Sequence, residues 1–100
     1  MDAFEAVAEP NRRRILDLLR SGERPAGALV AALALSQPGV SKHLKLLRES
    51  GLVRVRVYGQ QRLYSLAPQE FAALAAWLEP YRAFWRDRLD ALERHLDREQ

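Results

Sequence analysis

The segment SQPGVSKHLKLLRESG, residues 36–51, gathers cationic and hydrogen-bonding side chains on one short predicted helix. It holds two lysines, a histidine and an arginine but only one acidic residue. Ser36 is a good helix N-cap because its hydroxyl can accept a hydrogen bond from the first turn. Val40, Leu44 and Leu47 recur at i, i+4 and i+7, which predicts one buried stripe and a polar, basic outward face. Such a helix fits the major groove of B-DNA, where side chains can read base edges.

The positive charge of the chain is concentrated around that helix. The chain carries a formal net charge of +3, yet residues 36–66 hold six basic side chains against a single acidic one. Residues 1–35 are balanced, with five of each sign, and residues 67–100 carry five basic and seven acidic side chains. A continuous basic segment indicates contact with a polyanion, so we expect double-stranded DNA as the partner.

The stretch LVRVRVYGQQRLYSL, about residues 52–66, changes from a helical period to a period of two. Its valines alternate with Arg54 and Arg56, and the alternation breaks at YGQQ before it resumes, which predicts a β-hairpin with exposed arginines. About residues 26–50 read as two short helices across a tight turn. Helix, turn, helix and hairpin together predict a winged helix-turn-helix, a mainly α fold with a small β-hairpin.

The composition describes one domain over residues 1–100, with 48% hydrophobic and 29% charged residues. A core of this size would gain stability from a partner subunit. The chain has no cysteine, which removes disulfides, thiolate metal ligands and a cysteine nucleophile. No apolar run approaches the roughly 18 residues of a membrane span, and the N-terminus lacks a signal pattern. We therefore expect a cytoplasmic protein with no membrane partner.

The last third, about residues 68–98, has apolar residues spaced by three or four positions, as in a packing seam between helices. Pro80 lies within this pattern, so we expect a kink or a restart there. Fully helical, the segment would reach about 45 Å at about 1.5 Å per residue, too long for so small a body to cover. Part of the seam is therefore expected to meet another chain. The seam consists of Phe71, Leu74, Leu78, Tyr81, Trp85, Leu89, Leu92 and Leu96.

Three motifs, AEPNRRRILDLL, LSQPGVSKHLKLLRESGLV and GQQRLYSL, resemble the ArsR/SmtB family of bacterial winged-helix repressors over essentially the whole chain. The stretch WLEPYRAFW is similar to a branch without metal-binding cysteines. The resemblance implies a homodimer, built from the first and last helices, that binds an imperfect inverted repeat and represses its own or a neighbouring operon. Three residues depart from the family pattern. Glu9 stands where a better capping aspartate is common, so it is a weaker N-cap. Ala34 replaces a usual glycine and is strained if the turn needs positive φ, and Gly39 costs about 1 kcal/mol relative to alanine.

The resemblance also implies which residues of the recognition helix face the bases. These are Gln37, Pro38, Ser41 and Lys42. Gln37 can pair with adenine, Ser41 with several bases, and Lys42 with guanine or a phosphate. Pro38 has the equally open alternative of serving only as a first-turn residue. For His43, contact with DNA and a structural role inside the domain are equally open.

Four further cations are interpreted as phosphate anchors, which position DNA without specifying its sequence. They are Lys45, Arg54, Arg56 and Arg62. Arg54 and Arg56 have the alternative of being solvated strand residues. Arg12, Arg13 and Arg14 lie in an electrically neutral segment, so they are interpreted mainly as ion-paired helix surface, with Arg12 or Arg13 as a minor candidate for phosphate contact.

The predicted dimer interface joins the first helix to the C-terminal seam. It comprises Phe4, Leu74, Leu78, Tyr81, Trp85, Leu89 and Leu92. Aromatic residues cluster around Pro80, namely Trp77, Tyr81, Phe84 and Trp85. Aromatic residues at helical spacing indicate a dimer core, with a small-molecule pocket as the alternative, and the inducer is unknown.

The metal sensing of the family is not expected here. The short helix AGALVAAL offers no ligand for a soft metal, and the last helix offers only His95 with nearby carboxylates. We expect no metal and no cofactor. The sequence has no carboxylate pair beside a base, no phosphate-binding loop and no nucleophile at a suitable spacing from a histidine. We therefore do not expect an enzyme. The alternative function is a winged-helix module that holds a partner protein through its aromatic C-terminal stripe.

Overall fold

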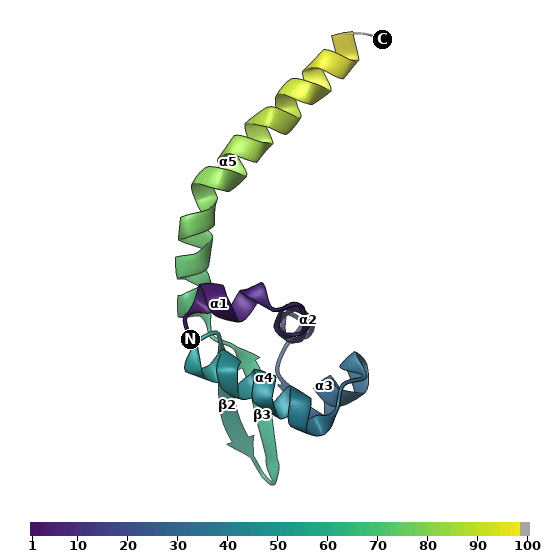
Figure 1. Cartoon of the computed structure of the whole chain (residues 1–100), viewed down its shortest axis with the longest axis vertical. Coiled ribbons are helices and arrows are strands. Elements are labelled where there is room, and N and C mark those ends of the chain that lie inside the picture. Colours follow the sequence, from purple (N-terminus) through teal and green to yellow (C-terminus); the bar gives the residue numbers. More distant parts are fainter. Residues whose placement is uncertain (99–100) are drawn as a thin grey trace.

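The computed structural model describes residues 1–98, which form five helices and a small three-stranded sheet (Figure 1). The predicted order of helices and hairpin is confirmed, and one short strand is added to it. The elements are α1 (Ala3–Ala8), α2 (Pro10–Leu19), β1 (Arg24–Pro25), α3 (Ala26–Leu33), α4 (Gln37–Glu49), β2 (Val53–Tyr58), β3 (Gln61–Leu66) and α5 (Pro68–Arg98).

Local chemistry fixes both ends of α4. The Ser36 hydroxyl accepts a hydrogen bond from the Gly39 N–H at 3.1 Å, so the predicted cap is confirmed. Beyond the helix, Gly51 has a φ of 83°, a left-handed backbone that favours glycine. The turn before α4 uses the same conformation without a glycine, because Ala34 has a φ of 54°. The predicted strain at this residue is therefore present.

The sheet has the order β1-β3-β2, and both pairings are antiparallel. Tyr58 pairs with Gln61, which leaves a two-residue turn in which Gly59 has a φ of 62°. The predicted hairpin is therefore confirmed. Strand β1 pairs Pro25 with Leu63 at the sheet edge, a position that tolerates the missing N–H of proline.

The core lies where α1 to α4 and the sheet meet. Its largest fully buried side chains are Ile15, Leu29, Val40, Leu44, Leu47 and Leu52. From α5 the core takes Leu74, with Phe71 packed against it. The buried stripe predicted for α4 is thus confirmed, and the polar face opposite it is left at the surface.

Helix α5 is one continuous helix of 31 residues with Pro80 inside it, so the predicted restart is wrong. Its course changes direction partway along in Figure 1, as the alternative prediction of a kink requires. Proline removes one helical hydrogen bond and bends a helix without necessarily ending it. The second half of α5 projects far from the body, and the molecule measures 61 × 26 × 22 Å.

The sequence suggested that the two arginines at the start of α2 are ion-paired surface residues. The structure corrects this interpretation, because both donate hydrogen bonds to backbone carbonyls. Arg12 is only 8% exposed, and its Nε donates to the carbonyl oxygen of Ala6 at 2.8 Å. Arg13 donates to the carbonyl oxygens of Val7 and Ala8 at 2.8 and 3.0 Å. These carbonyls end α1 and have no partner within the helix, so the arginines cap α1 and lock it against α2.

Candidate nucleic-acid interface

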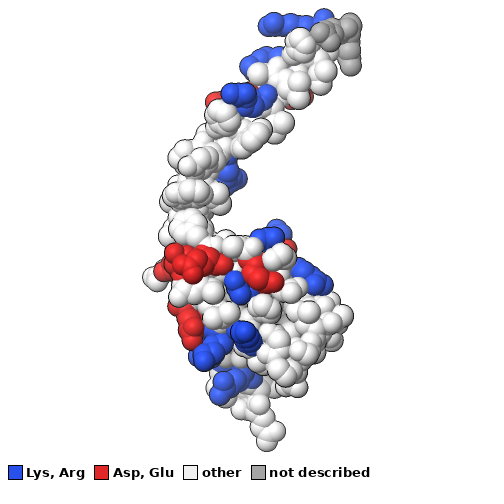
Figure 2. Space-filling model, viewed as in Figure 1, with Lys and Arg blue, Asp and Glu red and all other residues white. Residues whose placement is uncertain are grey.

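Helix α4 presents a short polar face to solvent, as its sequence predicted. Lys42 and Lys45 are exposed on it, while Val40, Leu44 and Leu47 turn into the core. Gln37, Pro38 and Ser41 are exposed at its N-terminal end. In Figure 2, basic atoms gather over α4 and the adjoining part of the wing, and acidic atoms gather over α1. The face therefore combines hydrogen-bonding groups with a local excess of positive charge.

His43 lies at the edge of this face and is turned inward. Its side chain is 19% exposed, and its Nδ1 lies 3.8 Å from Oε2 of Glu9. Within residues 1–98, this buried Nδ1 has no hydrogen-bond partner. Partial burial raises the pKa of Glu9, but backbone hydrogen bonds from Arg12 and Asn11 and the nearby charges bring it below its usual value. His43 therefore belongs to the contact of α4 with the α1–α2 junction.

The hairpin of β2 and β3, the wing, carries its arginines on two faces. Directly paired residues of an antiparallel ladder project to the same side. Arg62 pairs with Val57, so it shares the face on which Val53 turns to the core. Arg54 and Arg56 alternate with the valines and lie on the opposite face. The three arginines predicted as phosphate anchors therefore do not form one surface.

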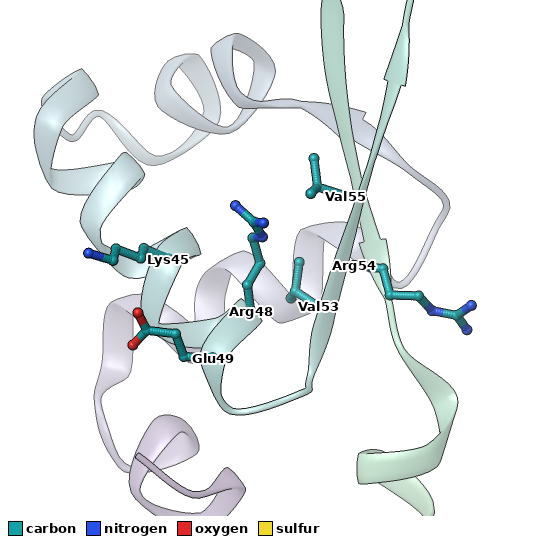
Figure 3. Close-up of a pocket in the computed structure, with 6 residues that line it drawn as sticks. All are labelled: Lys45, Arg48, Glu49, Val53, Arg54 and Val55. Carbon is teal, nitrogen blue, oxygen red and sulfur yellow. The ribbon is translucent and has the colours of Figure 1, made fainter.

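A cleft of about 500 Å³ separates α4 from β2. Figure 3 shows Arg48 extending from α4 into it, in front of Val53 and Val55, with Lys45 on the outer side. Arg54 points away from this group, from the far side of the strand. Arg48 was not among the predicted contacts, although it follows Lys45 by three positions and so shares a helix face with it. Helix spacing was the signal that could have identified it.

Arg56 differs from the other predicted anchors because it is held by a carboxylate. Its Nε donates to Oε2 and Oε1 of Glu23 at 2.9 and 3.2 Å, and its Nη2 donates to Oε1 as well. The guanidinium also lies 5.4 Å from the ring centre of Tyr58. In the free protein this guanidinium is therefore paired with a carboxylate, and a phosphate would have to compete for it.

The residues predicted for the dimer interface are exposed with one exception. Phe4 packs edge-on against Trp77 with ring centres 5.3 Å apart, and Trp77 lies 4.9 Å from Tyr81. This contact joins α1 to α5 as one apolar surface. The exception is Leu74, which is 8% exposed and packs in the core of its own chain. The other predicted residues are 43% to 62% exposed, namely Phe4, Leu78, Tyr81, Trp85, Leu89 and Leu92.

Residues 1–98 contain neither a metal-binding cluster nor a membrane-spanning helix. No cluster of three His, Cys, Asp or Glu side chains in this range could hold a metal ion. With no cysteine in the chain, the residues present do not fit a soft-metal site. No helix in the same range is long and apolar enough to span a membrane.

Comparisons with known proteins agree with this geometry. A helix-turn-helix domain model matches residues 7–56. The HTH-type transcriptional regulator Rv2034 of Mycobacterium tuberculosis is 37% identical over 97 residues, which cover 97% of this chain and 88% of the relative. The arsenic resistance transcriptional regulator ArsR1 of Pseudomonas putida is 42% identical over 67 residues, 66% of this chain and 52% of the relative.

Solved structures show the same architecture. A crystal structure of a possible transcriptional regulator for arsenical resistance has a TM-score of 0.74 at 43% identity, covering 92% of this chain and 93% of the other. The homodimeric winged helix-turn-helix DNA-binding domain of Mb0332 from Mycobacterium bovis has a TM-score of 0.67 at 31% identity, covering 84% and 78%. Fold and site thus define a winged helix-turn-helix DNA-binding transcriptional regulator. The chain belongs to the ArsR/SmtB family.

Proposed function

We propose that this regulator is a homodimeric repressor that binds an inverted-repeat operator. The observation that carries the proposal is the division of the molecule into two unpartnered surfaces. One is the polar, basic face of α4 with the wing, and the other is the exposed apolar face of α5 with Phe4. A two-fold dimer through the second surface would duplicate the first.

The N-terminal end of α4 would read the bases. Gln37, Ser41 and Lys42 are exposed there and offer an amide, a hydroxyl and an ammonium group. Amides pair with adenine and cations with guanine in the major groove. Pro38 lies in the first turn, where a proline suits a helix, and its ring would bring apolar contact. His43 is left out of this set because it faces Glu9.

The phosphates would be held on both sides of the α4–β2 cleft. Lys45 and Arg48 border the cleft, and Arg62 shares that side of the wing. Arg54 lies on the outer face, where the strand edge of the wing can meet the next groove. A helix in the major groove and a hairpin in the adjacent minor groove straddle one backbone strand. The cleft is where that strand would pass.

The dimer would use the exposed apolar residues of α1 and α5. With both copies in place, the two recognition helices would enter successive major grooves about 34 Å apart. The half-sites of the operator would then lie one helical turn apart. The alternative is an interaction module that uses the same apolar face to hold a different protein, and it requires neither self-association nor DNA.

A gel shift with the DNA upstream of the protein's own gene tests the proposal. We expect specific binding that weakens steeply with salt, because phosphate contacts release counterions. Gln37→Ala should relax base preference by about 1 to 3 kcal/mol. Arg48→Ala should weaken specific and random duplexes alike and reduce the salt slope by about 0.9.

The matched control is Arg94→Ala, which removes an exposed arginine of α5 far from the wing. It should leave both affinities unchanged. Equal binding to upstream and random DNA would overturn the repressor proposal. A monomer with no DNA affinity would instead support the interaction module.

A further inference from the structure

The ion pair of Glu23 and Arg56 places an acidic side chain on the wing of a DNA-binding surface. One guanidinium edge meets both carboxylate oxygens through Nε and Nη2. The two residues are 33 positions apart, so the contact is made by the tertiary fold. The side chain of Arg56 is 56% exposed and that of Glu23 is 32% exposed, so the pair is open to solvent and to a ligand.

The sheet register explains why this pair forms. Arg56 pairs with Leu63, which in turn pairs with Pro25 of β1, so all three side chains project from the same face. Glu23 precedes Pro25 by two positions and shares that face. The carboxylate thus reaches Arg56 across β3. Hydrogen bonding to Arg56 lowers the pKa of Glu23, so the carboxyl is ionised at neutral pH.

Arg56 is singular among the cations around α4 and the wing. No ion pair within residues 1–98 involves the others, namely Lys42, Lys45, Arg48, Arg54 and Arg62. Among these cations, a carboxylate therefore neutralises Arg56 alone.

We propose that Glu23 competes with DNA phosphate for Arg56 and thereby limits the affinity of the protein for duplex DNA. This inference rests on the proposed function, because it assumes that the wing meets DNA. A phosphate that approaches Arg56 must displace the carboxylate or accept its repulsion at close range. An exposed ion pair contributes little to stability, so displacing the carboxylate from Arg56 costs little free energy. Glu23 acts through its charge and not through the stability of the fold.

An opposing role for Glu23 would be to hold Arg56 in place for a phosphate. The two roles predict opposite signs, which makes them separable. Positioning saves part of the rotamer entropy of one side chain. Removing a negative charge from the DNA-facing side adds to the counterion release on binding. We expect the charge effect to dominate because it acts whether or not Arg56 stays in one rotamer.

Glu23→Gln tests the inference in the full-length protein, with a random-sequence duplex and salt from 50 to 200 mM. We expect binding to tighten about threefold to tenfold at the lowest salt, and the salt slope to steepen by about 0.9. The gain should then fall about threefold across this range. The control is Asp90→Asn, which removes one negative charge from the far part of α5. It should change neither the affinity for the duplex nor its dependence on salt.

Arg56→Ala and the double variant identify the route of the effect. If Glu23 acts by competition at Arg56, Glu23→Gln should gain much less in the Arg56→Ala background. Unchanged or weaker binding of Glu23→Gln overturns the inference, and so does an equal gain in both backgrounds. These outcomes are distinct from failure of the proposed function, in which the unmodified protein itself binds no duplex or shows no salt dependence.

Discussion

The body of the molecule and the outer half of α5 use apolar side chains in opposite ways. The body, which ends at about Leu74, encloses a core of leucines, valines and an isoleucine, with Leu44 at 1% exposure. Beyond it, α5 carries a comparable series of large apolar residues that are about half exposed. Both regions contain regular amphipathic helices, so helical structure alone does not explain the difference in exposure. The difference shows that one region closes its own core, whereas the other leaves an apolar stripe exposed, which the proposed dimer would cover.

The charges follow the same division. The basic segment lies entirely in the body, on α4 and the wing, whereas α5 mixes both signs around its apolar stripe. The stripe continues onto the body through the contact of Phe4 with Trp77. A partner on α5 would therefore be coupled rigidly to the reading surface. This coupling is what a paired DNA-binding device requires.

The largest effect should come from a charge placed in the apolar stripe of α5. Leu89→Glu would bring two like charges into an apolar two-fold contact, so we expect the dimer to dissociate about 100-fold more readily. Light scattering after size exclusion measures the mass. Arg94→Glu, the control, alters charge on the other side of α5 and should leave a dimer. Equal masses for Leu89→Glu and the unmodified protein would contradict the assignment of this surface.

Truncating one leucine in each region sharpens the comparison. Leu44→Ala should lower the free energy of unfolding by about 2 to 5 kcal/mol, because it leaves a cavity in the core. That loss should not depend on protein concentration. Leu92→Ala should cost little in dilute solution and more as the concentration rises, because its contacts would lie across the proposed dimer. Urea unfolding at several concentrations measures both, and parallel behaviour of the two variants would break the comparison.

Two exchanges between alanine and glycine, one just before α4 and one in its first turn, should affect the stability of the fold differently. Ala34→Gly should stabilise the fold by about 0.5 to 1 kcal/mol, since relief of the left-handed strain exceeds the added chain entropy. Gly39→Ala should not give the gain of about 1 kcal/mol expected from helix propensity. A Cβ there would lie 3.0 Å from the Ser36 Oγ that caps the helix. Thermal unfolding tests both, and a clear gain for Gly39→Ala would count against the cap.

The smallest effect concerns pH and the cap of α2. Glu9 accepts the Arg12 N–H at 2.8 Å, and its pKa lies below the ordinary value of 4.5. A lowered carboxyl pKa contributes stability above the ordinary pKa, and this contribution is lost as the pH falls through the folded value. Glu9→Gln should therefore flatten the loss of stability below about pH 4.5. The free energy of unfolding is measured from pH 3 to 7. If Glu9 has no such role, it should depend on pH in the same way for Glu9→Gln and for the unmodified protein.

Much of the fold could be predicted because its signals are local. The cap at Ser36, the stop at Gly51 and the period-two pattern before Gly59 each lie within a few residues of the structure they specify. The strand β1 was not predicted, because a strand of two residues is too short to show a periodic pattern. Pro80 suggested a kink or a restart, and the helix continues through it, because the loss of one hydrogen bond was not enough to end a long helix.

The site was predictable only in part, for a related reason. Residue type and helix spacing identified the outward face of α4, yet they could not show that Arg56 meets Glu23 across the sheet. They also could not show that Arg12 turns inward to the carbonyls of α1. In each case the partner lies on another element, and only the packing of elements brings the two together.

The central claim is that a dimer formed through α5 presents two copies of α4 to DNA. The most direct test of it is the selection of bound duplexes from a random-sequence pool. The account predicts an enriched motif with two symmetric halves whose centres lie about 10 base pairs apart. Leu89→Glu should lose that symmetry. A motif with a single half-site for the unmodified protein, or no enrichment at all, would contradict the account.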